Sequence, residues 1–161
     1  MVDKKVSIGD VGIVTESVSI SVFRLGSLLP CARQLAKMVK KSEEPDLQCF
    51  AMSTIMMCTA AIEASLFEYA YKNEKTIYED KYFRHNGIAK KYIALMGTKI
   101  EDDFKDVDEL VNIRNAIVHN EQDHKSGREL DIAKYLTGDK TLWAVKTTEE
   151  FVESILGTSF N

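Results

Sequence analysis

The chain has 161 residues, of which 45% are hydrophobic and 29% are charged. This length and composition fit one globular domain, residues 1–161, and exclude disordered and collagen-like classes. The formal charge of −4 and the pI near 5.4 exclude a protein that binds nucleic acid through an overall positive charge. Any contact with RNA would have to use a local basic patch.

The N-terminal third carries a helical pattern. Apolar residues recur at steps of three and four, which is the period of a helix face. They are Val14, Val18, Val22, Leu25, Leu29, Ala32, Ala36 and Val39. Pro30 should kink this helix or split it in two. The stretch "VSISV" alternates with a period of two and also fits a short strand, but the helix accounts for more residues.

The most hydrophobic segment begins at Pro45 and Asp46 and runs without a helix breaker for nearly thirty residues. It is apolar on almost all sides, which predicts the central helix of a bundle. We interpret its clustered methionines as core packing rather than as an adaptable binding surface. A polar joint is expected at residues 73–80.

Two further helices are expected in the middle of the chain. Asn86 can cap the first, and Gly97 ends it. Acidic residues then lead into a second helix that contains "VNIRNAIVHN", residues 111–120.

The C-terminal part becomes polar after His119 and then contains the short "LDIAKYL". The stretch "TGDKTLWAV" has turn and strand character, with Trp143 as an expected core anchor. Thr147 or Thr148 can begin a capping box for a last helix that Gly157 stops. The whole pattern predicts an all-α fold, an up-and-down bundle of four to six helices.

Several classes of site and location are not expected. Cys31, Cys49 and Cys58 form no CxxC motif, so we expect buried, reduced thiols in a cytoplasmic protein. No signal peptide is apparent, and no window has the roughly 18 uncharged apolar residues of a membrane span. His85 and His124 lack partners at metal-ligand spacing, so neither a metal site nor a cofactor is expected.

An arginine interrupts the apolar stripe of the helix at 111–120. On a helical wheel at about 100° per residue, Arg114 lies at the centre of the apolar residues Val107, Leu110, Val111, Ile117 and Val118. A polar row flanks this stripe and consists of Asp108, Asn112, Asn115 and His119. A buried guanidinium needs a partner, and Glu63 also faces apolar neighbours on the central helix. An internal Glu63–Arg114 pair that sets the register of two helices is therefore one interpretation.

The stretch "RNAIVH" resembles the R-x(4–6)-H signature of the HEPN superfamily, in which a polar residue commonly follows the arginine. The order of a long apolar helix with "AAIEASLFEYAY", a shorter helix and then the motif is also similar to that family. The resemblance covers about residues 46–120. It implies an HEPN-like helical bundle that forms a homodimer. By position in the motif, Arg114, Asn115 and His119 match the family's site residues, and Glu63 matches by helix order only.

What the resemblance implies is a metal-independent endoribonuclease, a toxin or an effector in defence against phage and stress. The motifs of two chains would face one cleft. Such an enzyme cuts RNA through the neighbouring 2′-hydroxyl, for which His119 can transfer the proton and Arg114 can bind the phosphate. An antitoxin or another regulatory protein is a possible partner. Some HEPN toxins carry a tyrosine two residues after the histidine, and their antitoxins modify it. This chain has Glu121 at that position, so this modification is not expected.

The stretch "KYFRHNGIAKKY" offers basic residues for RNA, namely Arg84, Lys90 and Lys91, with aromatic residues between them. A solvated helix face with aromatics turned inward is the other interpretation. Two non-catalytic functions also stay open: a helical interaction module with the internal Glu63–Arg114 pair, and a nucleotide-binding regulator that uses the same basic groove.

Overall fold

The structure, a computed structural model, describes residues 26–44, 46–119 and 132–157, and of His119 only the backbone. The first helical segment covers residues 26–39. The elements that follow are α2 (Asp46–Asn73), α3 (Lys75–Glu79), α4 (Lys81–His85), α5 (Ile88–Met96), α6 (Ile100–Asp103), α7 (Lys105–His119), the 3₁₀ helix η1 (Ile132–Tyr135) and α8 (Gly138–Leu156). The described ranges contain no strand, so the all-α prediction is confirmed for them.

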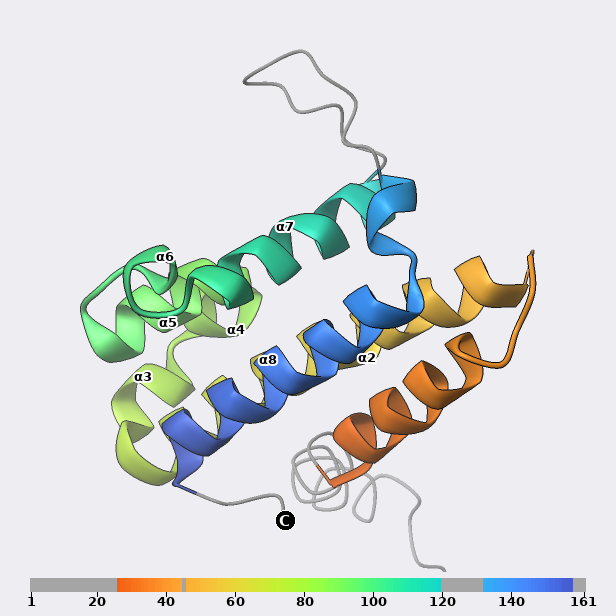
Figure 1. Ribbon diagram of the computed structural model, residues 1–161. Coiled ribbons are helices and arrows are strands. Elements are labelled where there is room, and N and C mark those ends of the chain that lie inside the picture. Colours follow the sequence, from red (N-terminus) through yellow and green to blue (C-terminus); the bar gives the residue numbers. More distant parts are fainter. Residues whose placement is uncertain (1–25, 45, 120–131, 158–161) are drawn as a thin grey trace, which may run out of the picture.

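Four long helices run alternately up and down, as Figure 1 shows: the helix at 26–39, α2, α7 and α8. Helix α2 packs along α8 and also contacts α7 and α5. The predicted up-and-down bundle therefore describes the main helices. The shorter helices α3 to α6 form the connection between α2 and α7 at one end of the bundle (Figure 1). The expected polar joint at residues 73–80 contains α3.

Helix α2 is the centre of the bundle, and its predicted start at Asp46 is confirmed. Eleven of its residues are buried, and they lie around most of its circumference. By length and composition α2 could cross a membrane, contrary to the expectation that no segment would qualify. However, 56% of its most apolar window is buried by the rest of the protein, as in the core helix of a bundle.

Local sequence signals place several helix ends correctly. Gly97 and Gly157 end α5 and α8 in the left-handed conformation, with φ of 75° and 64°. Glycine adopts this conformation without the steric cost of a Cβ atom. Asn86, which we expected to begin α5, instead follows the end of α4, and Gly87 precedes α5. The helix at 26–39 passes through Pro30, which lacks the amide hydrogen for one backbone bond.

The prediction of turn and strand at residues 137–145 is wrong, because α8 covers most of this stretch. Thr137 caps α8, and its side chain accepts a hydrogen bond from the backbone N–H of Lys140 at 3.3 Å. Thr147 and Thr148 are buried in the middle of the helix and cap nothing. The Thr148 hydroxyl donates to the carbonyl of the residue one turn earlier, so a β-branched polar side chain is accommodated inside the helix.

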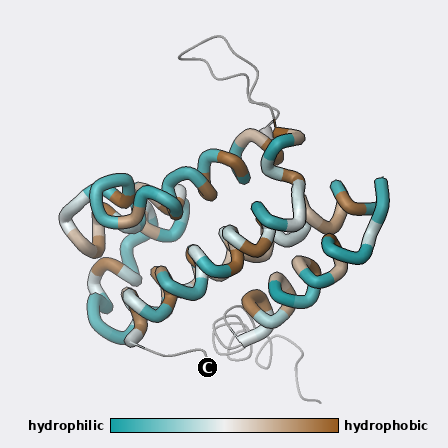
Figure 2. The backbone as a smooth tube through the Cα atoms, viewed as in Figure 1, coloured by the Kyte–Doolittle hydropathy of each residue, from teal (hydrophilic) through white to brown (hydrophobic). Residues whose placement is uncertain are grey.

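The core extends along the bundle and contains buried residues from the helix at 26–39, α2, α5, α7 and α8. Alternating polar and apolar segments along the helix at 26–39 and along α8 show how each helix contributes one face (Figure 2). At one end of the core, the rings of Phe104 and Phe151 meet edge to face, with centroids 5.0 Å apart. The centroid of the Tyr92 ring lies about 6 Å from the centroids of both other rings. These contacts pack α5 and α8 against the start of α7.

We expect Phe151→Ala to destabilise the protein by about 3–5 kcal/mol, because Phe151 is fully buried and its loss would leave a cavity. Leu142→Ala, on the same helix but 37% exposed, is the matched control and should cost less than about 1 kcal/mol. Urea unfolding followed by circular dichroism measures both values. Equal losses in the two variants would contradict this position of the core.

Candidate functional site

Arg114 lies within the buried face of α7, between Val107 and Leu110 on a helical wheel. Val107, Leu110, Val111, Ile113 and Ala116 are buried, whereas Val118 is 45% exposed. The centre of this face is near Leu110, about 40° from Arg114. Arg114 is therefore within the apolar face as predicted, but its side chain is half-buried rather than fully buried.

The guanidinium of Arg114 is held by its neighbour in the motif. Its Nη1 donates a hydrogen bond to the side-chain oxygen Oδ1 of Asn115 at 3.0 Å. Asn115 is also half-buried. A guanidinium has five N–H donors, so this bond leaves others that can bind an anion. The two residues that the sequence placed together therefore form one polar unit on the last two turns of α7.

His119 is the last residue of α7, one turn after Asn115. The position of its side chain lies outside what the structure describes, and so do Glu121 and His124. The rest of the predicted polar row is formed in part, because Asn112 donates to Asp108 Oδ2 at 3.1 Å. The backbone thus places Asn115 and His119 along one flank of α7, whereas Arg114 starts about 100° from Asn115 around the helix and reaches it through its long side chain.

Glu63 does not pair with Arg114 in the described part of the chain. Its Oε1 accepts a hydrogen bond from Lys91 Nζ at 2.5 Å. The Lys91 side chain is 1% exposed, whereas that of Glu63 is 39% exposed. The Lys91 ammonium also donates to the carbonyl of Asn86 and lies 4.7 Å from the centre of the Phe67 ring. Glu63 therefore does form an internal ion pair, but its partner is Lys91 on α5 and not Arg114 on α7.

Burial of Lys91 also corrects its expected role in RNA binding, since a sealed ammonium cannot meet a phosphate. Arg84 and Lys90 are exposed and stay available. Helical spacing contains a signal for this burial, because Lys91 lies three residues after Ile88 and directly before Tyr92, both of which are buried. The apolar face of α5 thus passes through Lys91.

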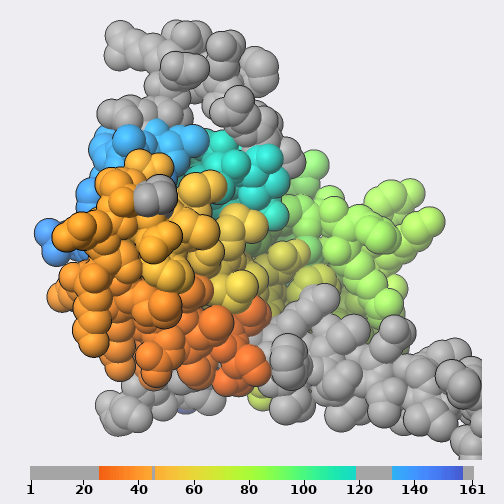
Figure 3. Space-filling model, turned by 90° about the vertical axis from the view of Figure 1, so that its right-hand side faces the viewer, coloured from red at the N-terminus to blue at the C-terminus, as the bar shows by residue number. Residues whose placement is uncertain are grey.

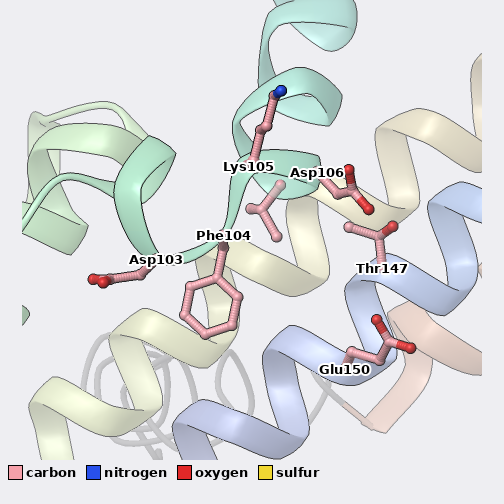
Figure 4. A pocket seen from close by; sticks show the side chains of 7 residues that line it. Asp103, Phe104, Lys105, Asp106, Thr147 and Glu150 are labelled. Carbon is pink, nitrogen blue, oxygen red and sulfur yellow. The ribbon is translucent and has the colours of Figure 1, made fainter.

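Two shallow recesses border α7, and neither includes Arg114 (Figure 4 shows the first). The first, about 330 Å³, lies between α7 and α8 and carries the carboxylates of Asp106 and Glu150 near Thr147. The second, about 270 Å³, lies beside η1 and includes Asp108 and Asn112. The negative charge of the first recess makes it unsuitable for a phosphate backbone.

Asp103 borders the first recess, but its carboxylate points away from Glu150 and toward α5 (Figure 4). Tyr92 donates a hydrogen bond to Asp103 Oδ2 at 2.8 Å, and the Thr98 hydroxyl donates to the same atom. These two bonds lower the pKa of Asp103. Burial first, and then the Asp103 carboxylate, raise the pKa of Tyr92 to about 12. This cluster connects α5 and α6 and has a structural role.

The cysteines differ in environment. Cys58 is buried, and burial raises the pKa of its thiol to about 12. Cys31 and Cys49 are exposed, so the prediction of buried thiols is correct for Cys58 alone. Over the described ranges, no three His, Cys, Asp or Glu side chains come together in a way that could hold a metal ion.

Comparisons with protein-family models, with curated proteins and with solved structures gave no match. The candidate site therefore depends on the residues of α7 and on their geometry.

We expect Glu63→Leu to destabilise the protein by about 2–4 kcal/mol, because it leaves the buried Lys91 ammonium without its counter-ion. Adding Lys91→Met should recover part of this loss, because the uncompensated charge is then absent. A double-mutant cycle from urea unfolding measures the coupling between the two residues. Additive losses would contradict the pairing.

We expect Tyr92→Phe to change how stability depends on pH. The folded-state pKa of Tyr92 is raised, so this group stabilises the wild type below pH 10 and loses that contribution as the pH rises toward 12. The lowered pKa of Asp103 stabilises the fold at neutral pH, and this contribution is lost as the pH falls through the folded-state value. Wild type should therefore be more stable than Tyr92→Phe at pH 7, with a difference that narrows at both extremes. Urea unfolding across the pH range tests this, and a constant difference would contradict it.

Proposed function

We propose that the protein is a metal-independent endoribonuclease of the HEPN type, a toxin or a defence or stress effector in the cytoplasm. The observation that carries the proposal is the Arg114–Asn115 hydrogen bond at the end of α7, one turn before His119. These residues match the Arg-Asn-x-x-x-His motif, and the bond holds the guanidinium against the side chain of Asn115, one turn before His119. The all-helical, up-and-down arrangement around α2 is compatible with the same family.

In the proposed reaction the RNA supplies its own nucleophile. His119 removes the proton from a 2′-hydroxyl, and the oxygen attacks the adjacent phosphorus. The bond to the 5′-oxygen breaks, and that oxygen receives a proton, so the products are a 2′,3′-cyclic phosphate and a 5′-hydroxyl. Arg114 binds the non-bridging oxygens and stabilises the charge that develops on them. Asn115 positions the guanidinium.

A homodimer is part of this proposal. One chain supplies a single His119, whereas the reaction needs a base for the 2′-hydroxyl and an acid for the leaving oxygen. A two-fold assembly brings a second set of the same residues. Neither of the two recesses includes Arg114, so the proposed cleft requires a second surface opposite α7. An antitoxin or another regulatory protein would act by covering this surface.

The position of Glu63 favours an available arginine over the non-catalytic alternative. That alternative relied on an internal Glu63–Arg114 pair, but the Glu63 carboxylate is bonded to Lys91. Across the described ranges, Arg114 takes part in no ion pair. The described side-chain contact of the Arg114 guanidinium is with the neutral amide of Asn115. The guanidinium charge is therefore available to an anionic ligand.

The purified protein should cut a mixed RNA pool in the presence of EDTA and leave cyclic-phosphate ends. His119→Ala should reduce the rate by about 10²- to 10⁴-fold, and Arg114→Ala by about 10²- to 10³-fold. Rates and end chemistry are measured on gels before and after phosphatase treatment.

Lys105→Ala is the matched control, because it removes an exposed positive charge from the first turn of the same helix. It should cut like the wild type. Unfolding curves of all variants exclude a loss of fold. Equal cleavage by His119→Ala and wild type, or no cleavage by the folded wild type, would contradict the proposal.

A further inference from the structure

Exposed aromatic side chains gather where α2 ends and α3 and α4 follow. Tyr71 and Tyr82 are 63% and 78% exposed, the two highest values among the exposed large hydrophobic side chains that the structure describes. The segment around α3 and α4 projects beyond the bundle and is green in Figure 3. Tyr71, Tyr78 and Arg84 contact one another in turn and form what we call the tyrosine surface. Tyr82 lies about 200° from Arg84 around α4 and is not part of it. Apolar rings of this size in water indicate a binding role.

The planar groups of this surface are held in a defined order. The rings of Tyr71 and Tyr78 meet edge to face, with centroids 5.3 Å apart and an interplanar angle of 70°. The Arg84 guanidinium lies 5.1 Å from the centre of the Tyr78 ring. Its Nε donates to the Tyr78 carbonyl at 3.2 Å, which leaves the terminal amino groups of Arg84 for a ligand. Fixed rings and a fixed guanidinium reduce the entropy lost on binding.

Helix α4 supports this surface although it has only five residues. The Asp80 side chain accepts a hydrogen bond from the backbone N–H of Tyr82 at 2.6 Å and another from that of Phe83. Phe83 is 3% exposed, and its ring packs edge to face on Phe67 of α2. At the other end of α4, the buried Lys91 ammonium binds the carbonyl of Asn86. The exposed Tyr82 and Arg84 are thus carried by a firmly held element.

The charges around the tyrosine surface favour an anionic partner. Two of its carboxylates have cations of their own, because Glu68 pairs with Lys72 at 2.6 Å and Glu79 lies 3.9 Å from Lys75. Asp80 is occupied as the cap of α4, and Glu74 is exposed. By contrast, the exposed cations of α4 and α5, namely Lys81, Arg84 and Lys90, form no ion pair with any described residue.

We propose that the tyrosine surface binds single-stranded RNA. Bases would stack on the exposed ring of Tyr71, and Arg84 and Lys81 would bind phosphates. The exposed apolar atoms here are ring faces separated by charged groups, which suits bases on a charged backbone better than the continuous apolar centre of a protein interface. This inference rests on the proposed ribonuclease function, because the role of the surface would be to hold the substrate strand. Because α4 lies near the end of the bundle where α7 begins, the strand is held away from His119 (Figure 1).

The test measures binding without cleavage. A fluorescent 2′-O-methyl oligouridylate cannot be cut through its 2′-oxygen, and its affinity for the full chain is obtained from fluorescence anisotropy. Tyr71→Ala and Arg84→Ala should each weaken binding by roughly 5- to 100-fold. Tyr71→Phe should bind within about twofold of the wild type, because it keeps the stacking face.

Met38→Ala and Lys37→Ala are the matched controls, since they remove an exposed apolar side chain and an exposed positive charge from the helix at 26–39. They should bind like the wild type. No binding by wild type, or equal losses in the controls, would overturn the inference. A protein that binds the probe through Tyr71 but cuts no RNA would contradict only the ribonuclease proposal.

Discussion

The buried ammonium of Lys91 constrains the arrangement of this protein more than any other single group. A buried cation is costly unless its donors are satisfied, and here Glu63, the carbonyl of Asn86 and the ring of Phe67 surround it. These groups belong to α2 and to the end of α4, so one side chain from α5 requires three elements to meet. The same requirement places the next residue, Tyr92, against the rings of the core.

This constraint separates the structural charges from the candidate site. Because Lys91 satisfies Glu63, the charge on Arg114 is not needed to balance the core. Arg114 is half-buried and binds Asn115, which is the next residue in the sequence. The motif on α7 is therefore organised by short-range contacts, whereas the register of α5 on α2 is set by a long-range pair.

In the proposed function, an acidic protein must meet RNA phosphates with local groups of cations. The net charge is −4, and the recess between α7 and α8 carries Asp106 and Glu150. Among the cations that form no ion pair with a described residue, Arg114 lies near the end of α7, and Lys81, Arg84 and Lys90 lie on α4 and α5. In the proposed function these two regions divide the work: the first holds the reacting phosphate, and the second holds the strand. Their separation along the bundle favours a substrate with an extended single-stranded part.

The sequence by itself determined the features that depend on neighbours along the chain. Periodicity and caps identified an all-helical protein, the start of α2, and the glycines that end α5 and α8. They also placed Asn115 and His119 on one flank of α7, beside the apolar stripe that contains Arg114. Only the tertiary structure decided that Glu63 pairs with Lys91, that Arg114 is half-buried, and that Tyr71 lies together with Tyr78 and Arg84. The physical reason is that periodicity shows which face of a helix is apolar, whereas the partner of a charge depends on which helix covers that face. The sequence of residues 137–148 predicts strand and cap positions because its threonines favour them locally. In the structure this stretch is helical, because burial against other helices outweighs the local preference.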